Sequence, residues 1–124
     1  MSKQDNLELW EEQAIKYKDN GVCAMDIAGD EFNFPVEIYK EILKRAKEEK
    51  INITIHAGES RGDESVEKSI EYGARRIGHG INSKDEEKVM KLAAQKSVCF
   101  EISFKSNIGT KLMDDFKEFP IKEF

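Results

Sequence analysis

Features that would indicate a secreted, membrane-bound or nucleic-acid-binding protein are scarce in this chain. No apolar run approaches the roughly 20 residues that a membrane-spanning helix needs, and the first residues lack the apolar core of a signal peptide. Lysine and arginine form no basic block, and the net charge of −5 argues against nucleic acid as a partner. We therefore expect a cytoplasmic protein that binds neither nucleic acid nor membranes.

Cysteine, proline and histidine are also rare, with two residues of each kind. Cys23 and Cys99 lie in apolar runs, which favours reduced packing residues over a disulfide or a metal pair. No repeat, linker or low-complexity tract divides the 124 residues, of which 39% are hydrophobic and 36% charged. This composition is typical of a soluble globular protein, so residues 1–124 are expected to form one domain with a modest core.

Short apolar runs alternate with amphipathic segments along the chain. The apolar runs predict strands, and the amphipathic segments before, between and after them predict helices. The strands are expected at residues 22–27, 51–55, 76–78 and 98–102, and the helices at residues 7–20, 35–50, 63–72, 84–95 and 110–119. Ser83 is expected to cap the helix that follows it, because Glu86 completes the capping-box spacing.

This alternation with short connections predicts an α/β fold with parallel strands and right-handed crossovers. Four such units are about half of a (β/α)8 TIM barrel, which usually needs about 250 residues. A half-barrel leaves two sheet edges open. We therefore expect the chain either to pair with another copy as a homo-oligomer or to be a piece of a longer enzyme.

Polar residues and glycines gather where the predicted strands end. His56 and Glu59 follow the second strand, and His79 follows the third between two glycines. Parallel α/β folds place their chemistry at this edge, histidine is a common metal ligand, and a carboxylate beside it can act as acid or base. The residues alone leave two hypotheses open: metal-assisted hydrolysis, or two histidines that only form hydrogen bonds at the sheet edge. Asp30 and Glu31, after the first strand, are expected to be solvated loop charges.

Four segments in order resemble motifs of the adenosine deaminase family. They are residues 26–31 (DIAGDE), 56–59 (HAGE), 76–80 (RIGHG) and 100–107 (FEISFKSN). The resemblance implies the central fragment of a TIM-barrel enzyme that uses zinc to hydrolyse adenosine, or a related aminopurine, to the 6-oxo product and ammonia.

The resemblance also implies roles for individual residues. In the family, the histidine that matches His56 is a zinc ligand, and the glutamate that matches Glu59 protonates the purine ring. The histidine that matches His79 orients the attacking water and helps to deprotonate it. The glycine that matches Gly29 contacts the substrate through its backbone.

The chain departs from the family pattern at the metal site. It has no H-x-H motif, and its one Asp-Asp pair, Asp114-Asp115, is expected to lie on the surface of a helix and not at a metal site. Because a catalytic zinc normally has three or more protein ligands, we expect the isolated chain to bind zinc weakly and to be inactive. The alternative is a non-catalytic half-barrel that self-associates.

Overall fold

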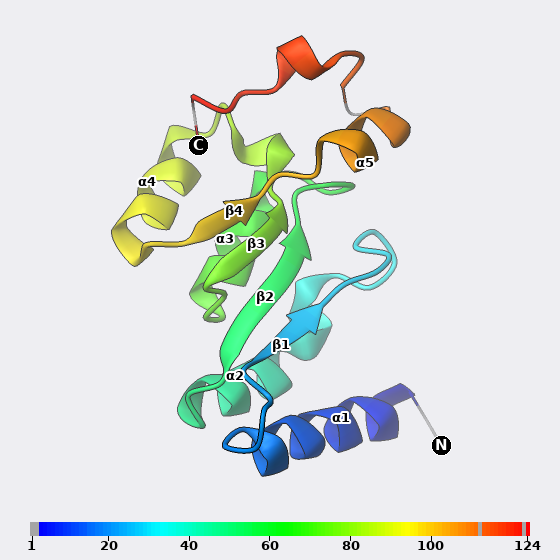
Figure 1. Cartoon of the computed structure of the whole chain (residues 1–124), viewed down its shortest axis with the longest axis vertical. Helices are drawn as coiled ribbons and strands as arrows, with labels where there is room; N and C mark the ends of the chain where they lie inside the picture. The colour runs from blue at the N-terminus through cyan, green and yellow to red at the C-terminus, as the bar shows by residue number, and fades with distance from the viewer. Residues whose placement is uncertain (1–2, 112, 123) are drawn as a thin grey trace.

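The computed structural model describes residues 3–111, 113–122 and 124 and shows one parallel sheet (Figure 1). Its four strands are β1 (Ala24–Ile27), β2 (Asn52–Ala57), β3 (Arg76–His79) and β4 (Cys99–Glu101). They are hydrogen-bonded in the order β1-β2-β3-β4, and every neighbouring pair is parallel. The predicted α/β class with four parallel strands is therefore confirmed.

A helical segment follows each strand, as the alternation predicts. The α-helices are α1 (Lys3–Tyr17), α2 (Lys40–Glu48), α3 (Asp63–Glu71), α4 (Glu87–Lys96) and α5 (Phe104–Gly109). Short 3-10 helices cover Val36–Tyr39, Ile81–Ser83 and Phe116–Glu118. None of the helices in the described part of the chain is both long and apolar enough to cross a membrane.

The core lies between the sheet and helices α2, α3 and α4. Ile53, Ile55 and Ile77 are at most 1% exposed and belong to one apolar cluster with side chains of these helices. Because side chains alternate across a strand, the residues between them, including Thr54 and His56, belong to the opposite face. The strand register places Asp26 beside Thr54 and His56 beside Gly78, so this second face carries polar residues.

The predicted helix at residues 110–119 is wrong. The helix in this region is α5, which ends at Gly109, and Asp115 precedes a short 3-10 helix instead. The amide N–H of Lys117 donates to Asp115 Oδ1 over 3.4 Å, which occupies this carboxylate as a local cap.

The predicted capping box is also wrong. Helix α4 begins at Glu87, and the side chain of its N-cap residue, Glu86, makes no capping hydrogen bond. Ser83 is buried, and its hydroxyl donates to the carbonyl oxygen of Gly80 over 2.7 Å. This hydroxyl therefore closes the loop after β3 rather than the helix start.

Both cysteines are free, as expected, but both are exposed. The prediction that they are packing residues is therefore wrong. Among the described residues, Cys99 belongs to β4, which pairs with a neighbour on one side only, and Cys23 precedes β1 at the other edge of the sheet. Edge positions leave such side chains uncovered.

Candidate functional site

The carboxyl ends of β2 and β3 bring the two histidines together. The ring centroids of His56 and His79 are 5.3 Å apart, with the ring planes at 66°. The register explains this proximity, because Ala57 pairs with His79 and His56 pairs with Gly78. His79 is 6% exposed and adopts a left-handed backbone with φ +68°, whereas about one third of the His56 side chain is exposed.

Each imidazole faces a carboxylate. Nε2 of His56 lies 3.6 Å from Oδ2 of Asp26, and Nε2 of His79 lies 3.5 Å from Oε2 of Glu59. The other oxygen of Glu59 lies 3.5 Å from the hydroxyl of Ser106, at the start of α5. The loops after β2, β3 and β4 therefore converge on the Glu59 carboxylate.

The absence of a side chain at Gly78 leaves room for the imidazole of His56. A Cβ atom at this position would lie 2.8 Å from Cδ2 and 2.9 Å from Cγ of the His56 ring. Because carbon atoms do not approach so closely without strain, the ring depends on glycine at this position.

We therefore expect Gly78→Ala to displace the His56 ring. The methyl group should cost on the order of 1 kcal/mol of folding free energy and shift the imidazole NMR signals of His56. Gly109→Ala is the control, because a Cβ there would meet nothing within 4 Å. Unchanged His56 signals in the Gly78 variant would contradict this packing.

A buried carboxylate from the β1 loop holds the loop that carries Glu59. Glu31 is 8% exposed, and its oxygens accept hydrogen bonds from four successive backbone N–H groups. The donor–acceptor distances are 2.7, 3.2, 2.9 and 3.0 Å for Gly58, Glu59, Ser60 and Arg61. The expectation that Glu31 is a solvated loop charge is therefore wrong, whereas Asp30 is exposed as expected.

These contacts also set the charge state of Glu31. Burial raises the pKa of this carboxyl, but hydrogen bonds from the Ser65 side chain and from the loop N–H groups outweigh burial. The net result is a pKa below the ordinary value, because the hydrogen bonds favour the ionised form.

Asn82 holds the same loop from the side of β3, and the sequence analysis did not single it out. Its Nδ2 donates to the carbonyl oxygens of Glu59 and Arg61 over 3.1 and 2.8 Å. Its backbone N–H donates to the carbonyl oxygen of Gly58 over 3.1 Å. No local pattern predicts these bonds, because the partners are 21 to 24 positions apart in the chain.

Gly29 lies in the β1 loop on the same side of the sheet. Its backbone has φ +124°, which favours glycine. Together with His56 and Glu31 it lines a small hollow of about 40 Å³. The structure thus places all four predicted site residues, His56, Glu59, His79 and Gly29, at the carboxyl edge of the sheet.

The described residues do not by themselves form a zinc site. No group of three or more histidine, cysteine, aspartate or glutamate side chains among them could hold a metal ion. His56 and Asp26 are only two ligand residues, and Asp115 is used as the local cap described above. A catalytic zinc needs at least three protein ligands.

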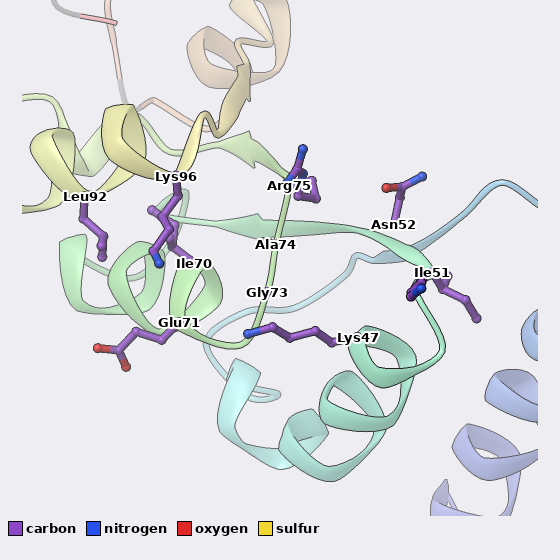
Figure 2. Close-up of a pocket in the computed structure, with 11 residues that line it drawn as sticks. Lys47, Ile51, Asn52, Ile70, Glu71, Gly73, Ala74, Arg75, Leu92 and Lys96 are labelled. Carbon is purple, nitrogen blue, oxygen red and sulfur yellow. The ribbon is translucent and has the colours of Figure 1, made fainter.

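A larger hollow lies elsewhere and lacks this chemistry. It has a volume of about 700 Å³ and lies at the amino ends of β2 and β3, between the ends of α2, α3 and α4 (Figure 2). It is lined by one carboxylate, Glu71, and by the cations Lys47, Lys50, Arg75 and Lys96. It contains no imidazole, so the site at the opposite edge is the better candidate for acid–base chemistry.

Comparison with protein families and curated proteins gives a consistent result. The family model described as "Adenosine deaminase" matches residues 1–124. The chain is 42% identical over 105 residues to adenosine deaminase from Clostridium acetobutylicum, which covers 84% of the chain and 31% of that protein. It is 40% identical over 114 residues to adenosine deaminase from Clostridium perfringens, which covers 91% of the chain and 34% of that protein.

Solved structures show the same fold at lower sequence identity. N6-methyl-AMP deaminase from Arabidopsis thaliana superposes with a TM-score of 0.84 at 21% identity, over 97% of the chain and 35% of that structure. Adenine deaminase from Arthrobacter aurescens superposes with a TM-score of 0.75 at 20% identity, over 91% of the chain and 37% of that structure. The chain thus spans about a third of the length of the curated relatives it matches.

Proposed function

The chain belongs to the adenosine deaminase family, and from this premise we propose that it supplies the central strands of a purine deaminase. In this proposal, residues 1–124 form one domain that is the central part of a longer TIM barrel. The substrate is adenosine or a related aminopurine, and the products are the 6-oxo purine and ammonia. One observation carries the proposal: His56, His79 and Glu59 converge at the carboxyl edge of a parallel sheet.

Glu59 is the proposed general acid. Its carboxyl group would hold a proton and donate it to a ring nitrogen of the purine, which draws electrons from the carbon that bears the amino group. Water then adds to this carbon and gives one proton to a base. The amino group takes up this proton and leaves as ammonia, and the second proton of the water restores the carboxyl group of Glu59. The position of Glu59 between His79 and Ser106 supports this role, because both neighbours can hold the carboxyl group in place.

His79 is the proposed base that orients the attacking water and accepts its proton. Its Nε2 faces Glu59 at 3.5 Å, so the acid and the base lie on the same side of the site. Gly29 would contact the substrate through its peptide group, since it borders the same hollow as His56 and has no side chain in the way.

His56 is proposed as one zinc ligand of the longer protein. The described residues do not complete a zinc site, so the other ligands would come from outside this chain. We therefore expect the isolated chain to bind less than one zinc ion per molecule and to show no efficient deamination.

A chimera tests this function. The matching segment of Clostridium perfringens adenosine deaminase, which is 40% identical, is replaced by this chain, so that the rest of the relative completes the barrel. Zinc per molecule and the rate of purine deamination are measured for the chimera and for the isolated chain, with adenosine, adenine and AMP as substrates.

The chimera is expected to bind zinc and to deaminate one of these substrates, whereas the isolated chain should not, even with added zinc. Robust turnover by the isolated chain would refute the ligand argument. A folded, zinc-loaded chimera that is inactive on all three substrates would refute the proposed function.

The alternative function is a non-catalytic half-barrel that self-associates. It is favoured by the sheet edges, because β1 and β4 each pair on one side only within the described residues. Sedimentation of the isolated chain separates the two: a stable dimer that does not need zinc, together with an inactive chimera, would support the alternative. A monomer would count against it.

A further inference from the structure

We propose that Glu31 and Asn82 are positioning residues that hold the backbone of Glu59 from two sides. This inference rests on the proposed function of Glu59 as the general acid. We call residues 58–61 the acid loop, because they include Glu59 and the backbone groups that Glu31 and Asn82 contact. Neither residue faces a reacting atom in the proposed chemistry, so each would act through Glu59.

Glu31 holds the N–H side of the acid loop. Two carboxylate oxygens accept from all four of its consecutive N–H groups, at 2.7 to 3.2 Å. Hydrogen bonds to an ionised acceptor are stronger than neutral ones, and four of them to one side chain restrict the backbone torsions of each loop residue. Oε2 also accepts from the Ser60 hydroxyl over 3.3 Å.

Asn82 holds the carbonyl side of the same loop. Its side-chain amide donates to the carbonyl oxygens on either side of Ser60, those of Glu59 and Arg61. The backbone of Glu59 is therefore bound at its N–H by the β1 loop and at its C=O by the β3 loop.

The packing beneath the acid loop leaves little room for movement. Gly58 has φ +71°, and a Cβ atom there would lie 2.6 Å from Cγ2 of Val66 and 3.2 Å from Cα of Gly80. The loop thus lies directly on the backbone of the β3 loop. The side chain of Glu59 extends from this restrained backbone, and its carboxylate has His79 and Ser106 on either side.

Such restraint matters because the rate of proton transfer depends on position. A misplacement of about 1 Å can cost roughly 100-fold in rate. The proposal therefore predicts that loss of either restraint lowers the rate through Glu59, not merely through folding.

Hydrogen exchange in the isolated chain tests the restraint without any need for activity. The variants are Glu31→Gln and Asn82→Ala. Asp30→Asn is the matched control, since Asp30 is the neighbouring carboxylate and accepts hydrogen bonds from Asn33 in its own loop instead of from the acid loop. We expect amide exchange in the acid loop to accelerate at least about tenfold in the two variants, while the amides of β2 and β3 keep their protection. Equal exchange in Glu31→Gln and Asp30→Asn would overturn the proposal.

A double-mutant cycle in the chimera separates positioning from a merely structural role. Glu31→Gln should lower kcat about 10- to 100-fold with KM nearly unchanged. In a Glu59→Gln background the same substitution should cost almost no further rate, because residues that act as a unit are not additive. The same fold-loss in both backgrounds would overturn the proposal.

The two experiments also separate this inference from the proposed function. An unchanged rate in Glu59→Gln alone would reject the proposed general acid and, with it, the purpose of the restraint. The other outcome combines both experiments. If Glu59→Gln lowers the rate of the chimera as expected but the acid-loop amides of the isolated Glu31→Gln chain stay protected, only the positioning role is rejected.

Discussion

Replacement of Glu59 by glutamine in the chimera should lower kcat by about 10²- to 10⁴-fold, the range that a general acid typically contributes. Glutamine has nearly the same size and can still face the imidazole of His79 and the hydroxyl of Ser106. It has no acidic proton to give to the purine ring. The loss should therefore appear in kcat, with KM and the thermal melting temperature close to those of the unchanged chimera, as measured by steady-state kinetics and calorimetry.

Glu64→Gln is the matched control for this prediction. Glu64 is exposed, lies in the first turn of α3 and is five residues from Glu59. Its replacement should leave kcat unchanged. A Glu59→Gln chimera that keeps more than a tenth of the original kcat would show that Glu59 is not the general acid.

Replacement of Glu31 by alanine should destabilise the isolated chain by roughly 3 kcal/mol near neutral pH, because several backbone N–H groups at a largely buried site lose their acceptor. This is a large fraction of the total stability of a small domain. Urea unfolding followed by circular dichroism measures the difference between the variant and the original chain.

The size of this difference should depend on pH. The pKa of Glu31 is lowered in the folded chain relative to the ordinary value of 4.5. The stabilisation by the ionised carboxylate is therefore fully present above pH 4.5 and is lost as the pH falls through the folded pKa. The difference in unfolding free energy between the original chain and Glu31→Ala should therefore become smaller as the pH falls through this acidic range.

Glu64→Gln again serves as the control, since an exposed carboxylate without such bonds should show little change in stability. A Glu31→Ala variant with the same unfolding free energy as the control at neutral pH would show that the acid loop does not depend on this carboxylate. If the difference in unfolding free energy between the original chain and Glu31→Ala grows as the pH falls, the lowered pKa of Glu31 is contradicted.

The positions of His56 and His79 could be predicted from local patterns. Each follows a short β-branched or apolar run, and parallel strands bring their carboxyl ends to one edge of a sheet. These signals need only a few neighbouring residues, so sequence alone was enough to place both histidines at the same edge.

Glu31 could not be predicted in the same way. Its backbone partners in the acid loop are 27 to 30 residues away in the chain, and the residues around it have the composition of an ordinary polar loop. A carboxylate in such a loop is usually solvated. Glu31 is buried because the β1 and β2 loops contact each other in the folded chain, and only the tertiary structure shows this contact.

The capping residues show a further limit. Ser83 and Glu86 have the spacing of a capping box, but the hydroxyl of Ser83 bonds to Gly80 and α4 begins three residues later than the spacing predicts. The fold of the β3 loop, in which Ser83 is buried and donates to Gly80, therefore sets the role of this hydroxyl.

The sequence by itself determined the parallel α/β architecture and the edge at which the polar residues gather, because strand and helix periodicity and chain order are local properties. Only the tertiary structure decided which loops meet at Glu59, how the acid loop is restrained and which carboxylates are buried. These features depend on hydrogen bonds and contacts between segments 20 to 50 residues apart, and no short-range pattern in the chain encodes them.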